Sequence, residues 1–581
     1  MKQVAPLSEF SASPRLWLHQ VDESFDPETD AVIGPWCFQG VEDKHPEWTR
    51  LPFGSRFEDG AEIYQAANDI RGFANALVPQ FAERLNRQHG VSHGLEYWRT
   101  ILLPWLIFVL PAIYRRYVEI ADFVSKNHQV PYSVAIDDAA FDWRAASLRD
   151  LWHDVFGDHG FHYWLSSRIL ERIHPPDWTL ERAAARHPGP DRPATGAAQR
   201  NLASAWKAKS RCRAVPGVRQ WQVPLSLLLS ALPRKQKRPY APTPDLAASQ
   251  AALPVPFTKL LDDILWSLLP ETLTTGFSDI DRQAQKHTFR PGKVNLVGPV
   301  LMLDEEEKFR LAHAREQGEL VVCSQHGGQG YQLLPLPLAE TEYKQDAYLT
   351  WGWTNQNNLD GNFIPVPSPL FSRWSDKHKE KEDRLLLVST DLQMYSQRLQ
   401  TTELQGAFCI ENRDQKKTFL AALPPAILSR TTYRPYPKSR GALEDETYLQ
   451  RLVPEISVAG PEVSPRALRR LMLRYRLLVV DHPVTTFSFA MAANVPCIGF
   501  WNPRAWPMTP QSSGIFAALT DAGVIHHSAD AASCHAGDIW HDVDAWWKSP
   551  QVQAARIAFC RQYARTDRFW WWHWAKALWN L

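Results

Sequence analysis

Short apolar runs alternate with helical segments through the C-terminal part of the chain, and this alternation leaves few folds open. Residues 385–388 and 477–480 are runs of Leu and Val that end in polar residues, and residues 496–500 form a third apolar run. Helical patterns cover residues 466–474 and 487–493. Strands that alternate with helices are typical of a parallel sheet with helices on both faces. We therefore predict a doubly wound, Rossmann-like domain in this part of the chain.

A similar alternation occurs in the first 374 residues. Residues 30–33, 130–136 and 319–323 have the composition of short strands, and a long helical pattern covers residues 58–127. We predict a second Rossmann-like domain here, so that the fold class of the chain is α/β with two such domains. A length of 581 residues is enough for more than one hydrophobic core.

The expected domain boundaries follow the charge and proline content. Residues 181–240 contain thirteen Lys or Arg but only two acidic residues, and several prolines follow. This composition predicts a basic, Pro-rich insertion at about residues 176–256. A second charged stretch, residues 375–384, separates the two halves. The prediction is an N-terminal acceptor domain at 1–374, a C-terminal nucleotide-sugar domain at 375–560 and a Trp-rich helix at 561–581.

Overall charge and cysteine content exclude several classes of protein. The chain carries 64 Lys and Arg against 63 Asp and Glu, so charge offers no argument for nucleic-acid binding. Seven cysteines without C-x-x-C spacing argue against a disulfide framework and against a structural zinc site. The longest apolar run, residues 101–113, contains Pro104 and Pro111 and is shorter than the about 20 residues of a membrane span. We expect a buried helix in two pieces there, and a cytoplasmic protein whose contact with the inner membrane is at most peripheral.

The residues after the apolar runs are the first candidates for a binding site. Ligands of an open parallel sheet lie beyond the carboxyl ends of its strands, where Ser389 and Thr390 follow one predicted strand. Thr485 and Thr486 stand at the start of a predicted helix, where free amide groups and a partial positive charge favour phosphate. The alternative is that these hydroxyls only cap the helix.

A glycine-rich loop follows the strand predicted at residues 319–323. It begins Gln325-His326-Gly327-Gly328, and glycines let a backbone approach a ligand closely. His326 can bond a phosphate or carry a proton near neutral pH. The alternative is a histidine with a purely structural role.

An arginine and a tyrosine lie in a second candidate loop, which prolines stiffen. The guanidinium of Arg434 can form two hydrogen bonds to a phosphate. Tyr436 stands two positions later in the sequence. The alternative for Arg434 is a surface salt bridge. We predict that both residues bind the donor.

Gly34, Pro35 and Trp36 follow the first predicted strand. We expect them to line a cleft between the two domains, together with Gln325, Gly327 and Gly328. Asp137 and Asp138 follow the strand at residues 130–136.

An inverting sugar transfer needs one group that takes the acceptor proton. By loop position alone Asp137, Asp138, His326 and Asp481 all qualify, and the sequence does not rank them. Asp542 and Asp544 have D-x-D spacing but are interpreted as part of a helix cap. We therefore predict no metal and no cofactor beyond the donor itself.

The Trp-rich tail, residues 568–579, has two interpretations. Its Trp and basic residues are typical of a membrane interface. The alternative, which we prefer, is a terminal helix packed across the two halves.

Several of these segments resemble a family of bacterial transferases encoded with surface-polysaccharide genes. The resemblance rests on residues 34–37, 325–328, 351–353, 481–503, 539–540, 544–547 and 559–564. These segments span most of the chain except the basic insertion. It implies a transferase acting on a surface glycan.

A wider resemblance is to GT-B glycosyltransferases that use CMP-activated acidic sugars. Those enzymes have two Rossmann-like domains facing one cleft, with a His-Pro motif and a Ser/Thr pair for the nucleotide. Here Tyr436 precedes Pro437 where that motif would lie, and Thr485-Thr486 matches the pair. His482-Pro483 is an alternative match. A tyrosine departs from the motif because a phenol cannot become cationic.

The resemblance implies an enzyme that transfers an acidic sugar from a CMP donor to a surface glycan or to its lipid-linked precursor. It also implies that the reaction needs no metal. One alternative is transfer of a polyol phosphate such as glycerol phosphate. Another is a non-catalytic carbohydrate-binding assembly protein, which the 25 Trp residues would suit.

Overall fold

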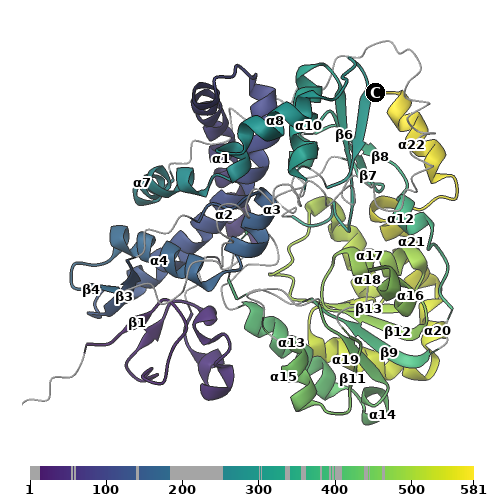
Figure 1. Ribbon diagram of the computed structural model, residues 1–581. Helices are drawn as coiled ribbons and strands as arrows, with labels where there is room; N and C mark the ends of the chain where they lie inside the picture. Colours follow the sequence, from purple (N-terminus) through teal and green to yellow (C-terminus); the bar gives the residue numbers. More distant parts are fainter. Residues whose placement is uncertain are drawn as a thin grey trace, which may run out of the picture.

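The computed structural model has two larger parallel sheets, one in each half of the chain (Figure 1). It describes residues 13–53, 57, 60–138, 143–183, 253–299, 301, 304–333, 341–354, 361–379, 382–390, 394–395, 398–399, 408–436, 443, 445–460 and 465–581. The predicted α/β class, with a parallel sheet in each half of the chain, is confirmed.

The C-terminal sheet has six parallel strands in the order β11-β10-β9-β12-β13-β14. These strands are β9 (Glu382–Val388), β10 (Thr431–Arg434), β11 (Ser457–Val458), β12 (Tyr475–Val480), β13 (Cys497–Phe500) and β14 (Ile525–His526). The order reverses between β9 and β12, and this switch point is where doubly wound sheets bind ligands. Val388 pairs with both Arg434 and Val480. The three strands therefore end together, and the residues that follow them share one edge.

The apolar runs of β9 and β12 are buried on both faces. Leu386 and Leu478 belong to the large core, whereas Leu385 and Leu477 belong to a second core. Helices cover the two faces: α13 (Phe408–Ala422), α15 (Asp445–Leu452), α16 (Pro465–Met472), α17 (Thr485–Ala493), α18 (Ser513–Asp521) and α19 (Ala529–Ile539). Successive residues of a strand face opposite sides, so a strand between two helical layers is apolar throughout, as this sequence is.

The N-terminal sheet has four parallel strands in sequence order. They are β5 (Val294–Val297), β6 (Leu320–Ser324), β7 (Ala347–Thr350) and β8 (Phe363–Pro365), and α8 (Phe277–Gln285) and α10 (Glu305–Glu316) accompany them. The last helix of the chain, α22 (Trp570–Trp579), packs Trp574 and Leu578 against Val322 and Leu349 of this sheet. The tail thus packs onto the N-terminal half, beside β8 (Figure 1).

The remaining strands form two small sheets rather than joining the main one. β1 (Leu16–Trp17) pairs with β2 (Ala31–Val32), and β3 (Ser133–Asp137) pairs with β4 (Thr179–Ala183). The N-terminal half therefore divides its strands among three parallel sheets. Most of the predicted insertion at 176–256 lies outside the described residues, which resume with α7 (Val255–Ile264) after residue 252.

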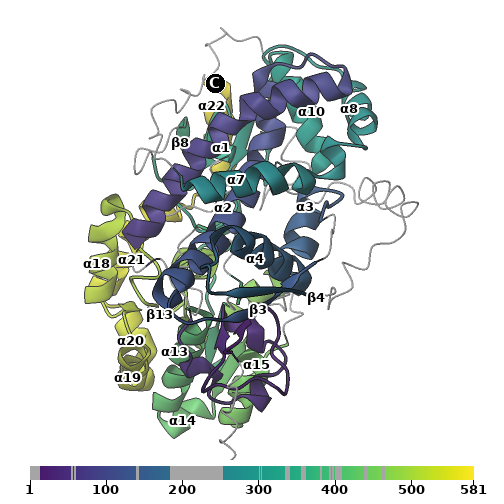
Figure 2. The same cartoon turned by 90° about the vertical axis from the view of Figure 1, so that its left-hand side faces the viewer.

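One long helix, α2 (Leu95–Asn127), corrects the expectation of a helix in two pieces. Pro104 and Pro111 lie inside it without breaking it. It packs against α1 (Gly60–His89), α10 and α4 (His159–Ile173) (Figure 2), and this burial outweighs the hydrogen bonds that proline removes.

Helix α2 is also long and apolar enough to cross a membrane by length and composition, the one such helix among the described residues. However, 94% of its most apolar window is buried inside the protein. Such burial is typical of a core helix.

Candidate functional site

The glycine-rich loop after β6 contacts the start of α17. Two candidate sites that were predicted in different halves of the chain therefore lie next to each other. The Gly328 amide donates a hydrogen bond to Oγ1 of Thr485, with 3.0 Å between the atoms. Tyr331 and Ser488 join their hydroxyls at 2.9 Å. A Cβ on Gly327 would lie 2.7 Å from Thr485 Oγ1. The glycines are thus needed for the close approach of the two elements.

Thr485 does not act as the cap of α17. The N-cap position is Val484, and no side chain caps the helix there. The Thr485 hydroxyl instead serves the contact between the halves. Thr485 and Thr486 both stay partly exposed, so the start of this helix is not sealed within the core.

Gln325 holds the loop in shape. Its Oε1 accepts hydrogen bonds from the Trp351 amide and from Nε1 of Trp353, each at 2.8 Å. Its Nε2 donates to the Gly327 carbonyl at 2.7 Å. The side chain is fully buried, so Gln325 supports the glycine-rich loop from inside the protein.

His326 faces a carboxylate that the sequence did not reveal. Nε2 of His326 lies 3.3 Å from Oε2 of Glu342, which is buried. Burial alone would lower the pKa of His326, but the negative charge of Glu342 outweighs it and raises that pKa. The side chain of His326 remains 20% exposed. The pair therefore has the arrangement of a base oriented by a second group.

Asp481 organises the edge where β9 and β12 end. Its Oδ1 accepts hydrogen bonds from Nδ1 of His482 at 2.6 Å and from the Thr390 amide at 3.0 Å. Burial by itself would raise the pKa of Asp481, but the His482 hydrogen bond and the charge of Lys416 hold it below its ordinary value. Asp481 is therefore an anion at neutral pH.

Lys416 is a second residue that sequence reasoning missed. Its Nζ lies 2.6 Å from Oδ2 of Asp445 and 3.8 Å from Oδ2 of Asp481, and it also donates to the Thr390 carbonyl. Arg413 bonds the other oxygen of Asp445 at 2.7 Å. A buried lysine on α13 thus ties two carboxylates to the edge of the sheet.

Ser389 and Arg434 lie on the same edge, as predicted. The Ser389 amide bonds the Arg434 carbonyl at 3.1 Å, and both side chains are buried. Oγ of Ser389 has no hydrogen-bond partner among the described residues. Tyr436, two residues beyond β10, is 47% exposed. Arg434 is thus not the surface ion pair that was its alternative interpretation.

The segment Gly34-Pro35-Trp36 is buried in contact with the C-terminal half. The Trp36 ring stacks on Tyr395, which follows β9 in sequence, with 5.3 Å between ring centroids. The Arg116 guanidinium lies over the Trp36 ring, 3.7 Å from its centroid. Trp36 therefore belongs to a packed junction between the halves.

The remaining acidic candidates lie elsewhere. Asp137 ends β3, is buried, and its amide bonds Oγ of Ser167 at 2.9 Å. Asp138 pairs with Arg182 of β4 at 2.8 Å. Both belong to the small β3–β4 sheet rather than to the loop at His326. Asp542 caps α20 (Val543–Trp547) through the Ala545 amide, which confirms its interpretation as a helix cap.

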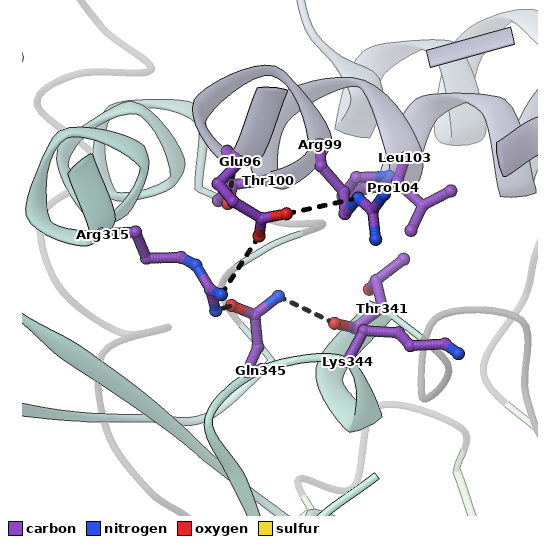
Figure 3. A pocket seen from close by; sticks show the side chains of 9 residues that line it. All are labelled: Glu96, Arg99, Thr100, Leu103, Pro104, Arg315, Thr341, Lys344 and Gln345. Atoms are coloured by element: carbon purple, nitrogen blue, oxygen red, sulfur yellow. Dashed lines mark hydrogen bonds and ion pairs between the residues drawn. The ribbon is translucent and has the colours of Figure 1, made fainter. Parts of the chain in front are cut away.

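A polar pocket lies beside the segment that carries Glu342 (Figure 3). Arg99, Arg315 and Lys344 line it, together with Glu96, which reaches Arg315 at 3.2 Å. Glu96 lies within ion-pair distance of both Arg99 and Arg315, so the lining is largely neutralised by its own residues.

Two solved structures are similar over most of the chain. The apo structure of OtsA has 9% sequence identity and a TM-score of 0.32, over 77% of this chain and 98% of that one. A mutant of the O-GlcNAc transferase of Thermobaculum terrenum has 10% identity and a TM-score of 0.28, over 90% of this chain and 85% of that one. No curated protein matches the sequence.

A family profile gives the decisive match. The profile described as LIC12162 family transferase aligns with residues 14–578, which include both large sheets and α22. On this evidence the chain belongs to the LIC12162 family of transferases.

Proposed function

We propose that this transferase is a glycosyltransferase, moving an acidic sugar from a CMP-linked donor to a bacterial surface glycan or its lipid-linked precursor. One observation carries the proposal. The ends of β9, β10 and β12 coincide at the switch point of the sheet, and the glycine-rich loop of the other half contacts the helix that starts there. A donor bound at this edge would meet groups from both halves.

The donor phosphate would bind between Ser389 and the start of α17. The Ser389 hydroxyl is buried and has no hydrogen-bond partner in the described part of the chain, and leaving such a group unsatisfied costs about 1–3 kcal/mol. Hydrogen bonding to a ligand oxygen would remove that cost. The first amides of α17 add further donors and a positive dipole end. The buried Arg434 supplies positive charge beneath the same edge.

His326 is the best candidate for the base. Glu342 faces its Nε2, so we assign proton acceptance from the acceptor hydroxyl to Nδ1. The carboxylate of Asp481 is already engaged by His482 and Thr390. Because Asp137 and Asp138 lie in the β3–β4 sheet, neither is favoured. No step in this scheme needs a metal or a further cofactor.

Contact with the cytoplasmic face of the inner membrane is part of the proposal. The outer face of α22 and the residue before it expose Phe569, Trp571 and Trp572 beside Arg568. Aromatic and basic side chains gather in this way at lipid interfaces. Sedimentation with anionic vesicles tests it: Trp571→Ser with Trp572→Ser should reduce the bound fraction, and unchanged binding would contradict it.

A nucleotide panel tests the donor assignment. The melting temperature of the purified chain is measured with CMP, CDP and UDP. A ligand at 100 times its Kd stabilises the folded state by about 2.7 kcal/mol, so CMP should raise the melting temperature by several degrees. Stabilisation by UDP or CDP alone would overturn the CMP assignment, and a CDP response would favour polyol phosphate transfer. Glycans that stabilise without any nucleotide would favour the carbohydrate-binding alternative.

Two variants localise that effect. Thr486→Ala should remove most of the CMP response, because Thr486 is a proposed donor ligand. Thr485→Ser is the matched control, since it keeps the hydroxyl that Gly328 uses. If the CMP response of Thr486→Ala matches that of the wild type, the proposed phosphate site is wrong.

A further inference from the structure

Three metal-binding side chains meet in the N-terminal half, apart from the site described above. His93 lies just before α2, Asp281 on α8 and His313 on α10. One ligand atom from each lies within 4.8 Å of the others. Each residue comes from a different element, so an ion here would join all three.

The spacing of the three side chains is close to that of a metal site. Nε2 of His313 lies 2.6 Å from Oδ1 of Asp281, and Nε2 of His93 lies 3.6 Å from Oδ2 of the same carboxylate. Ligands at 2.0–2.2 Å from a tetrahedral zinc stand about 3.3 Å apart. Nε2 of His313 and Oδ1 of Asp281 form a hydrogen bond, which an ion would replace, and small side-chain rotations would bring the three atoms to ligand distance. Two imidazoles and a carboxylate suit zinc and similar transition metals, whereas magnesium prefers oxygen ligands.

Surrounding residues already hold the ligands in the orientation that a metal needs. Oε2 of Glu316 lies 3.0 Å from Nδ1 of His93, and Oε1 accepts from the Gly94 amide at 2.7 Å. This contact turns Nε2 of His93 inward, where it is buried without a hydrogen-bond partner among the described residues. A carboxylate that orients a ligating histidine in this way is common at metal sites.

Asp281 is oriented by two further groups. Gln285 donates to its Oδ2 at 2.8 Å, and the Tyr97 hydroxyl donates to its Oδ1 at 2.5 Å. Asp281 and His313 are buried, so the carboxylate cannot turn to solvent. Glu316, Gln285 and Tyr97 thus hold the three side chains in place from behind.

We propose that His93, Asp281 and His313 bind a zinc ion, with Glu316 positioning His93 and water completing the coordination. The ion would cross-link the start of α2 to α8 and α10, beneath the four-stranded sheet. Its role is structural, and it is independent of the donor site. The absence of C-x-x-C spacing argued against structural zinc, but that argument concerns cysteine ligands and not a histidine pair.

Zinc titration of the chelator-treated full chain tests the proposal. Bound metal is measured by elemental analysis, and affinity by competition with a chromophoric chelator. We expect one zinc per chain, and at least a 100-fold loss of affinity in His93→Asn with His313→Asn. The matched control is His526→Asn with His535→Asn, whose rings are 5.0 Å apart against 5.1 Å for His93 and His313. This control should bind zinc as the wild type does.

Two further measurements protect the test against misfolding of the double variant. Glu316→Gln leaves all ligands in place and should weaken zinc binding by about 10- to 100-fold. X-ray absorption of the zinc-loaded wild type should show two imidazole ligands. No zinc binding by the wild type, fewer than two imidazoles, an unchanged affinity in Glu316→Gln or in the double variant, or equal loss in the control would each overturn the proposal.

Discussion

The hydroxyl of Thr485 receives a hydrogen bond from the amide of Gly328, a residue from the other half of the chain, at 3.0 Å. The contact ties the helix that begins beyond β12 to the loop that follows β6. The loop that carries His326 is therefore joined directly to the start of α17.

Replacing Gly328 by alanine should open the junction. A Cβ there would lie 2.7 Å from the hydroxyl oxygens of Ser488 and Tyr331 and 2.8 Å from the Val484 backbone. Backbone cannot give way cheaply, so we expect a loss of stability of about 1–3 kcal/mol, measured by urea denaturation. Gly460→Ala, where nothing lies within 4 Å, should stay within about 0.5 kcal/mol. Equal stability of the two variants would contradict this account of the junction.

The pH profile of transfer should follow His326. A base must be neutral to accept a proton, and Glu342 raises the pKa of His326. Activity is therefore expected to fall as the pH drops through that raised pKa. His326→Asn should reduce kcat by about 10²- to 10⁴-fold.

Glu342→Gln separates the role of Glu342 from a merely structural one. Removing its negative charge lowers the pKa of His326, so the acid limb of the kcat profile should move to lower pH. The folded state is monitored by circular dichroism. A profile that keeps its acid limb while activity falls would show that Glu342 does not act through His326.

Lys416 should contribute strongly to stability. It is fully buried beside Asp445 and Asp481, so Lys416→Met leaves two carboxylates without their shared cation. Breaking a buried pair in this way costs about 3–5 kcal/mol. Lys548→Met, which removes an exposed pair with Asp544 at 2.6 Å, should cost under about 1 kcal/mol. Denaturant titration of both variants gives the comparison, and similar losses would show that the Lys416 network is not stabilising.

Tyr395 should act mainly through packing. Its ring lies parallel to His162 with 3.8 Å between centroids, and its hydroxyl bonds His159. Tyr395→Ala removes the ring from a buried junction and should cost about 3–5 kcal/mol. Tyr395→Phe loses only the hydrogen bond and should cost about 0.5–1.5 kcal/mol. If thermal denaturation ranks the phenylalanine variant as the less stable, the hydrogen bond rather than the stack holds the junction.

The strands of the C-terminal sheet were predictable because strands buried on both faces have consecutive apolar residues. Residues 385–388 and 477–480 are apolar throughout, and they lie between two helical layers. The polar residues after them mark the strand ends, so Ser389 and Asp481 could be placed at one edge. The limits at residues 374 and 560 stay predictions.

Partners distant in the chain could not be predicted in the same way. Glu342 and Lys416 carry no local signal, because each acquires its role from a contact that only the fold creates. The continuity of α2 through Pro104 was missed for a related reason. Proline weakens an isolated helix, whereas here the neighbouring helices supply the compensating burial. The cluster around Asp281 combines residues from three elements and has no sequence spacing of its own.

Helix α22 has a consequence for how the protein is made. Val322 and Leu349 of the N-terminal sheet are covered by Trp574 and Leu578. During translation, the apolar side of that sheet stays uncovered until these late residues have left the ribosome. The core of the N-terminal half is therefore complete only after α22 has been synthesised. Truncation before residue 570 is expected to yield aggregates rather than a smaller folded enzyme.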